Sequence, residues 1–140
     1  MFRSRRPRVA LHKAPYEDDC RYDIVGESYR MENILAVVKE GRRRKLTRQY
    51  GNWSKLGVQF WLVPEPTNEF DPNAVMVLAG TEEYDQESSI LVGYVNRNDA
   101  KRMSKRLNRS FPVLGVLVGT AGKFGAKLDR ETLRDAELLS

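Results

Sequence analysis

An aromatic ring and a carboxylate stand side by side at Phe70 and Asp71, within residues 62–77. The prolines of this segment fix the backbone φ angle and lack an N–H group, so its middle suits neither a helix nor a sheet. Such a turn would present both side chains outside a sheet. An exposed ring can stack on a flat ligand, and a carboxylate can accept the hydrogen bond of a hydroxyl group. The alternative is a plain turn whose Phe70 packs over the edge of the core.

The flanks of this segment favour strands. Residues 58–63 and 74–78 are largely β-branched, aromatic or otherwise apolar, as strands prefer. Asn68 and Asp71 are residues whose side chains hydrogen-bond the backbone of turns. The sequence therefore predicts a strand, a tight turn and a second strand.

Several kinds of chemistry are excluded by residue counts. Cys20 is the only cysteine, which excludes an intramolecular disulfide and any zinc site with several cysteines. His12 is the only histidine, so we expect no Cys/His metal cluster, no Ser-His-Asp triad and no cofactor. No apolar run reaches the roughly 18 residues of a membrane span, and no apolar segment follows the basic N-terminus. We expect a cytoplasmic protein in a reducing compartment.

The formal net charge of +5 is unevenly distributed. Cations gather in three blocks, at residues 3–13, 42–48 and 101–109. Clustered cations interrupted by aromatic residues suit a polyanionic partner. The alternative is a solvated basic surface that keeps the protein soluble.

Periodicity predicts one mainly β domain over residues 16–140, preceded by a flexible basic arm at residues 1–15 that could bind phosphates without sequence preference. Strands are expected at residues 21–26, 58–63, 74–78, 89–95, 113–118 and 123–128, and helices at 28–39, 99–108 and, as a short terminal helix, 129–139. Five or six short strands with two or three helices fit a small barrel-like sheet, a class that binds nucleic acid on an open face and its loops.

The first expected helix has apolar positions recurring at i, i+3, i+4 and i+7, at Met31, Ile34, Leu35 and Val38. Ser28 is its expected N-cap and Gly41 its expected stop. Tyr29 and Arg30 fall where strand gives way to helix, a natural anion site because backbone N–H groups are free there. A core position for Tyr29 is the alternative.

Two further local signals concern residues 89–108. Gly93, inside the strand expected at residues 89–95, indicates a bulge or the close approach of another backbone. Asn96 or Asn98 is expected to cap the helix that follows.

Residues 42–57 are expected to be a long polar connection with aromatic residues among cations. Loops of this length are usually functional or mobile, and interleaved rings and cations are typical of channels for single-stranded nucleic acid. Trp53 and Arg44 are therefore candidate nucleic-acid contacts. The alternative is a flexible insertion whose Trp53 packs on the barrel.

Three blocks in this order resemble the HIRAN domain family: VGESYRMEN at residues 25–33, LVPEPTNEFDPNAV at 62–75 and VGYVNRNDA at 92–100. The resemblance spans about residues 22–128 and implies an OB-like or SH3-like β-barrel with two helices. The best understood members are modules of DNA-remodelling helicases that capture the 3′ end of single-stranded DNA. The chain looks like the stand-alone bacterial or phage members, since it has no helicase motifs.

The resemblance also implies roles for individual residues. Tyr29 and Phe70 match aromatic positions that contact the terminal nucleotides and stack on the end base. Asp71 matches the carboxylate that receives the 3′-hydroxyl. Arg97 falls on a basic position that approaches phosphate, and Tyr94 on a polar ring that lines the pocket.

The chain departs from the family pattern at a few positions. Ser28 replaces an arginine that contacts phosphate, and Arg30 could supply the lost charge. Phe70 has no phenolic hydroxyl, and the insertion at residues 42–55 is longer than usual.

Three functions remain open at this point. The first is a non-catalytic module for single-stranded DNA or DNA 3′ ends, associated with the nucleoid. The second is a protein-interaction domain that holds a partner segment in the same cleft. The third is a metal-dependent nuclease using Asp18, Asp19 and Asp71, although adjacent residues of an extended segment point apart.

Overall fold

The computed structural model describes residues 21–120 and 122–139. The arm expected at residues 1–15 lies outside the described residues, as do His12 and Cys20.

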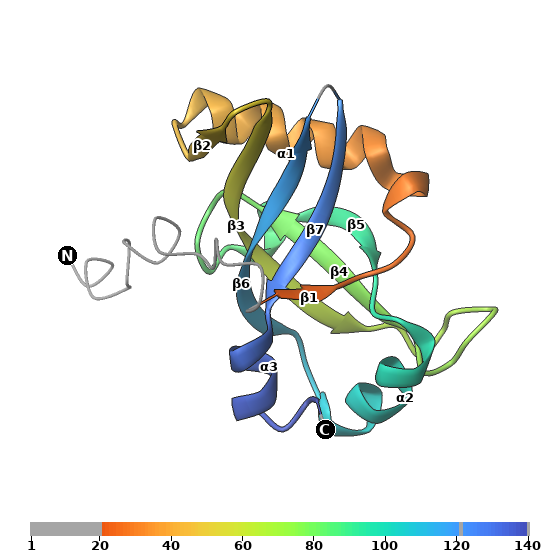
Figure 1. The fold of residues 1–140 in the computed structure, drawn as a ribbon. Helices are drawn as coiled ribbons and strands as arrows, with labels where there is room; N and C mark the ends of the chain where they lie inside the picture. The colour runs from red at the N-terminus through yellow and green to blue at the C-terminus, as the bar shows by residue number, and fades with distance from the viewer. Residues whose placement is uncertain (1–20, 121, 140) are drawn as a thin grey trace.

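Seven strands form one antiparallel sheet in the described part of the chain (Figure 1). They are β1 (Arg21–Asp23), β2 (Thr47–Tyr50), β3 (Trp53–Pro64), β4 (Val75–Gly80), β5 (Ile90–Tyr94), β6 (Phe111–Thr120) and β7 (Lys123–Asp129). The order across the sheet is β1-β7-β6-β3-β4-β5, and β2 pairs with β3 outside this path. The sheet curls into a barrel-like shape, so the expected fold class is confirmed.

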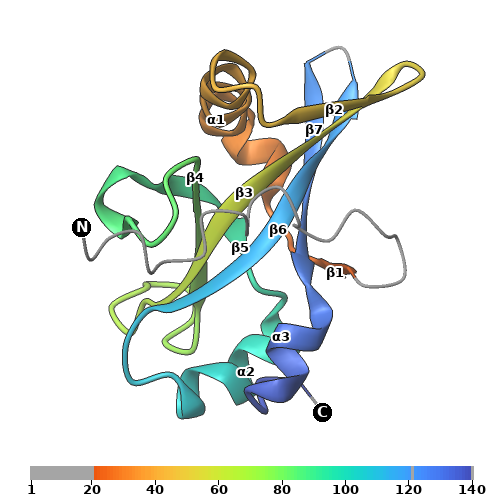
Figure 2. The ribbon, with the colours of Figure 1, turned by 90° about the vertical axis from the view of Figure 1, so that its left-hand side faces the viewer.

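The helices lie at the two ends of the curled sheet. They are α1 (Met31–Arg43), α2 (Arg97–Arg106) and α3 (Arg130–Asp135), with 3-10 turns η4 (Glu27–Arg30) and η5 (Gln86–Ser88). Figures 1 and 2 show α1 across one end and α2 with α3 at the other. None of the helices in the described part of the chain is long and apolar enough to cross a membrane.

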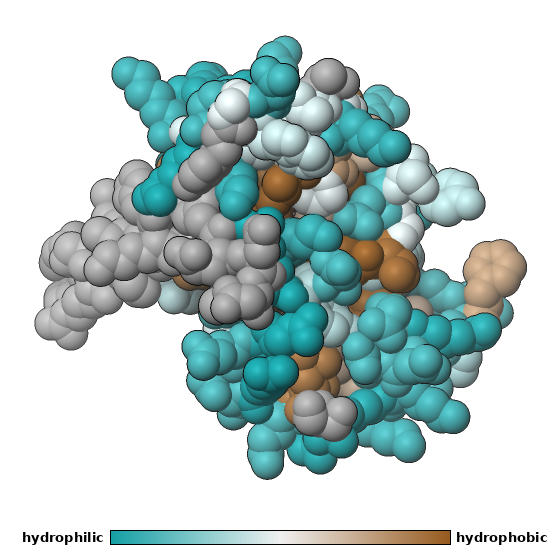
Figure 3. Space-filling model, viewed as in Figure 1, coloured by the Kyte–Doolittle hydropathy of each residue, from teal (hydrophilic) through white to brown (hydrophobic). Residues whose placement is uncertain are grey.

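The central strand β3 connects most of the sheet. Its first half pairs with β2 and β6, and its second half pairs with β4 and β6. Side chains alternate along a strand, and the inward positions of β3 are fully buried apolar residues: Leu56, Val58, Phe60 and Leu62. They form the core with residues from β4, β6, β7 and α1. Outside this core, hydrophilic side chains cover most of the face seen in Figure 3.

The barrel closes where the segment after β1 meets the end of β5. The N–H of Val25 donates to the carbonyl of Tyr94 at 2.8 Å, and the N–H of Tyr94 donates back at 2.9 Å. A Cβ atom at Gly93 would lie 2.6 Å from the carbonyl oxygen of Val25. The register of β4 against β5 also shifts beside Gly93, between Val77 and Leu78. The prediction of a bulge and a close backbone approach at Gly93 is confirmed.

Gly93→Ala is expected to lower the free energy of unfolding by about 1–3 kcal/mol, because an added methyl group must push the closing backbone away. Urea denaturation followed by circular dichroism measures this. Gly125→Ala in β7 is the control, since its Cβ would meet only the carboxylate end of Glu27, at 3.2 Å. An equal loss in both variants would contradict the explanation.

The predictions for the first helix were partly wrong. Ser28 lies in η4, whose N-cap is Gly26 with a φ of 80°. Leu35 is exposed, because the buried face of α1 contains Ile34, Val37, Val38 and Gly41. Gly41 does not end the helix; a Cβ atom there would lie 2.3 Å from Leu56 Cδ1, so this glycine lets α1 approach β3. The left-handed residue that ends α1 is Lys45, with a φ of 61°.

The prediction of a long loop at residues 42–57 was also wrong. The end of α1 and the hairpin of β2 and β3 occupy this stretch. Tyr50 pairs with Trp53 across the two-residue turn of Gly51 and Asn52, and Gly51 has a φ of 59°. A glycine with a positive φ at the first position suits a two-residue hairpin turn. The hairpin adds β2, which brings the sheet to seven strands rather than five or six.

Candidate functional site

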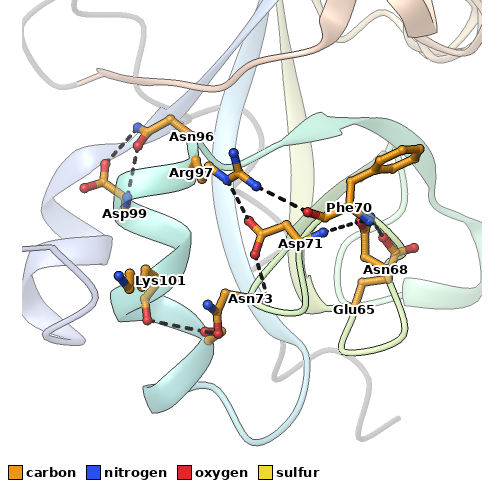
Figure 4. Close-up of polar contacts among 10 residues, drawn as sticks. Glu65, Asn68, Phe70, Asp71, Asn73, Asn96, Arg97, Asp99 and Lys101 are labelled. Carbon is orange, nitrogen blue, oxygen red and sulfur yellow. Dashed lines mark hydrogen bonds and ion pairs between the residues drawn. The ribbon is translucent and has the colours of Figure 1, made fainter.

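The segment between β3 and β4 is a tight loop built around Asn68. Its side-chain oxygen accepts hydrogen bonds from the N–H groups of Phe70 and Asp71, each at 2.9 Å (Figure 4). Asp71 Oδ1 accepts from the N–H of Asn73 at 2.9 Å. The predicted capping roles of Asn68 and Asp71 are therefore confirmed. The Phe70 side chain is 85% exposed, so the alternative in which it packs over the core edge is wrong.

Arg97, the first residue of α2, connects this loop to the helix. Its Nη2 donates to the carbonyl of Phe70 at 3.2 Å. Its Nε lies 3.7 Å from Asp71 Oδ2, too far for a hydrogen bond. The Asp71 side chain is 20% exposed, and a carboxylate oxygen has two acceptor positions. Oδ2 can therefore accept a hydrogen bond from a hydroxyl group while it faces Arg97.

The start of α2 is fixed by a partly buried polar cluster. Asn96 caps the helix, since its Oδ1 accepts from the N–H of Asp99 at 3.0 Å, which settles the choice between Asn96 and Asn98. The Tyr22 hydroxyl donates to Asp99 Oδ2, and Asn96 Nδ2 donates to the Tyr22 oxygen at 3.0 Å. Burial, followed by this bond to Asp99, raises the pKa of Tyr22. Arg97 is thus the first residue of a helix whose start is fixed by hydrogen bonds.

A second connection runs from the loop to the closure of the barrel. The Tyr94 hydroxyl donates to Glu65 Oε1 at 3.1 Å, and Asn68 Nδ2 donates to the same oxygen at 2.6 Å. Burial and then the bond to Glu65 raise the pKa of Tyr94, while the nearby Arg30 guanidinium lowers it. The Tyr94 backbone pairs with Val25 at the closure. The hydroxyl of Tyr94 consequently links β5 to the loop.

Most of the predicted site residues therefore form one connected group: Arg30, Phe70, Asp71, Tyr94 and Arg97. Tyr29 adjoins it in the chain, and its N–H donates to the carbonyl of Gly26 at 3.2 Å. Its side chain is 87% exposed, so the alternative of a core position is wrong.

Two candidates lie elsewhere. Arg44 donates from Nη1 to the carbonyl of Thr81 at 2.8 Å and pairs with Glu82 at 2.7 Å, beyond the end of β4 that is opposite the loop. Trp53 is the first residue of β3, whereas the loop follows its last residue. The structure therefore does not bring Arg44 and Trp53 to the group around Phe70.

Sequence reasoning missed Glu65, which joins Asn68 to Tyr94. Its local signal is only an acid beside a proline. The hydroxyl group from which Glu65 accepts a hydrogen bond belongs to a residue 29 positions away. Pairing of β3 with β4 and of β4 with β5 creates this contact, which no spacing in the sequence indicates.

Asn68→Ala is expected to destabilise the fold by about 1–2 kcal/mol and to weaken any ligand contact made by Phe70 and Asp71. The variant leaves two backbone N–H groups without the oxygen that orders them. Thermal unfolding and ligand titration would measure the two effects. Asn52→Ala, in the exposed hairpin turn, is the control. A variant at Asn68 that behaves like this control would disprove the ordering role.

No group of three or more His, Cys, Asp and Glu side chains that could hold a metal ion occurs among the described residues. Asp18 and Asp19 lie outside the described residues, so the nuclease arrangement with Asp71 stays a hypothesis.

Comparison with known proteins gives one finding. The family model described as HIRAN domain matches residues 18–135, most of the 140-residue chain. Neither curated proteins nor solved structures gave a match.

Proposed function

Because the chain belongs to the HIRAN domain family, we propose that it is a non-catalytic module that captures single-stranded DNA, preferentially at its 3′-hydroxyl end. Membership of this family indicates a DNA-binding domain. The observation that supports the preference for an end is the pairing of an exposed ring at Phe70 with the Asp71 carboxylate, which is held beside Arg97.

The ring would supply affinity without sequence preference. A base stacked on an aromatic side chain contributes about 1–3 kcal/mol, and every base has a face that can stack. The Phe70 N–H donates to Asn68 Oδ1, and the Phe70 carbonyl accepts from Arg97 Nη2, so the backbone is held on both sides of the Phe70 side chain. The backbone that carries the ring therefore needs little ordering when a base arrives, and ordering is one of the main costs of binding.

The carboxylate would supply the preference for an end. A 3′ terminus carries a hydroxyl group where an internal nucleotide carries a phosphate. Asp71 Oδ2 accepts a hydrogen bond from the hydroxyl group, whereas the same charge repels a phosphate at that position. Discrimination of this kind uses a repulsive contact as well as an attractive one.

Cations around the loop would hold the preceding phosphates. The exposed guanidinium of Arg97 lies next to Asp71, and Arg30 lies next to Tyr94. Each phosphate that they neutralise contributes about −0.7 to the slope of log affinity against log salt. Arg30 would then compensate for Ser28, which cannot make the charged contact of the related arginine.

The remaining parts of the proposal concern organisation. Residues 16–140 would form a single domain, and the basic residues 1–15 an arm that adds salt-dependent affinity for phosphates. Such a module would act in the cytoplasm, in association with the nucleoid and its single-stranded DNA ends.

A titration with labelled oligonucleotides tests the proposal. Three single strands are compared with a blunt duplex at two ionic strengths. One ends in a 3′-hydroxyl, one ends in a 3′-phosphate, and one has a blocked 5′ end. We expect tight binding only for single strands that end in a free 3′-hydroxyl, unaffected by the block at the 5′ end. Equal affinity for 3′-hydroxyl and 3′-phosphate strands would refute the role of Asp71. Negligible affinity for all DNA would favour a protein partner instead.

A further inference from the structure

A hollow lies between the loop that connects β3 to β4 and the C-terminal end of α2. It has a volume of about 480 Å³, within the range of ligand-binding pockets. The loop contributes Pro66, Pro72 and Asn73, and residues 104–110 contribute most of the facing wall. Figure 4 shows the Asn73 side chain turned toward α2 and the Phe70 ring turned away from it. The hollow is therefore separate from the group around Phe70.

The ends of the strands explain why this space exists. Leu62 of β3 and Phe111 of β6 form the last pair between these two strands. Beyond this pair β3 continues beside β4 alone, as far as the pair of Pro64 with Val75. The chain that leads into β6, at residues 107–110, therefore runs outside the sheet. The hollow lies between this segment and the prolines that follow β3.

Much of the wall of the hollow is apolar. Val63 and Leu107 are half-buried there, and Leu107 also packs against the core. The rings of Pro64, Pro66 and Pro72 add apolar surface, and burying a proline costs no side-chain rotamer entropy. None of the described residues that line the hollow is aromatic, so they offer a nucleotide base no ring on which to stack. The wall suits an apolar side chain of a partner.

Hydrogen-bond donors accompany this apolar surface. Lys105 and Arg109 line the hollow and are exposed. Within the described part of the chain, neither of these side chains forms an ion pair or a hydrogen bond. The Ser104 hydroxyl donates to Asn73 Oδ1 at 3.3 Å, so the amide nitrogen of Asn73 can still donate. Ammonium and guanidinium groups form their strongest hydrogen bonds with anionic oxygens. The donors of the hollow therefore suit carboxylates.

We propose that this hollow binds a short acidic segment of a partner protein. One apolar side chain of the segment lies against the prolines and Leu107, and flanking carboxylates pair with Lys105 and Arg109. An anchor side chain in a pocket supplies most of the affinity of such contacts, and complementary charges speed association and fix the orientation. The same cations would attract phosphates, but a DNA strand would leave the apolar wall uncovered. The inference goes beyond the capture of DNA and does not depend on it.

Fluorescence anisotropy with pools of labelled peptides tests the proposal on the whole chain. In the first pool, octapeptides of Asp and Glu contain one Leu, Ile or Phe at a varied position. Glycine replaces the apolar residue in the second pool, and Asn and Gln replace the acids in the third. We expect saturable binding of the first pool and binding of the other two that is weaker by about 10-fold or more. Failure of the first pool to bind, or equal binding of the first pool and either other pool, would overturn the proposal.

Paired charge variants locate the binding. Replacing both Lys105 and Arg109 by Gln should weaken binding of the first pool by about 10-fold. Replacing both Lys101 and Arg102 by Gln removes the same two charges from exposed positions of α2 and should leave the binding nearly unchanged. An equal loss in the two variants would overturn the assignment.

A linear strand with a 3′-hydroxyl end distinguishes the two sites. It should bind equally to the Lys105/Arg109 variant and to its matched control. Weaker binding to the Lys105/Arg109 variant would make the hollow part of the DNA site and would overturn the proposal. Phe70→Ala should weaken binding of the DNA strand and leave peptide binding unchanged, so either site can fail without the other.

Discussion

Asp71→Asn is expected to reduce the preference for a 3′-hydroxyl over a 3′-phosphate end by about 10- to 150-fold. This range corresponds to the roughly 1.5–3 kcal/mol of a hydrogen bond to a charged group. The 3′-hydroxyl strand loses a charge-assisted acceptor, and the 3′-phosphate strand no longer meets a negative charge. The ratio of the two affinities is the quantity to measure, because both changes move it in the same direction.

This substitution should leave the loop folded. The amide oxygen of asparagine can still accept the hydrogen bond that the N–H of Asn73 gives to Asp71 Oδ1. Asp85→Asn, at an exposed position beyond the opposite end of β4, removes the same charge and is the matched control. If the control and Asp71→Asn show the same ratio of affinities, then Asp71 does not read the end.

Phe70→Ala is expected to weaken binding of single-stranded DNA by about 1–3 kcal/mol, or about 5- to 150-fold. The free energy of unfolding should stay within about 0.5 kcal/mol of the original protein, because an exposed ring contributes little to the core. Isothermal titration and urea denaturation would separate the two quantities. A loss of affinity without a loss of stability is the expected signature of a direct contact.

Two further substitutions distinguish stacking from simple apolar contact. Phe70→Tyr keeps the ring and should retain the affinity, whereas Phe70→Leu keeps an apolar side chain without a ring and should behave like alanine. A leucine variant that binds as well as the original protein would argue against stacking. The same comparison tests whether the missing phenolic hydroxyl matters at this position.

Local signals predicted the elements that depend on local physics. The prolines near Phe70 and the capping oxygens of Asn68 and Asp71 act within a few residues, so the turn was predictable. Asn96 caps α2 through the N–H three residues ahead, and Gly93 marks the closure of the barrel. These features depend on backbone geometry and on hydrogen bonds between near neighbours.

The wrong predictions share a different cause. The polar strand β2 has no apolar alternation to reveal it and pairs only with β3, outside the main path of the sheet. Gly41 resembles a helix stop, yet its lack of a side chain serves the contact with Leu56. In both cases the deciding interaction comes from another element.

The sequence by itself determined a mainly β fold, a proline-rich turn that carries a ring beside a carboxylate, and the family to which the chain belongs. That the ring is exposed was decided only by the tertiary structure. Only the tertiary structure decided that Arg97 and Tyr94 hold this turn, that Glu65 joins them, and that Trp53 lies at the other end of β3. The physical reason is that strand pairing and barrel closure bring together residues far apart in the chain, and no local spacing encodes those contacts.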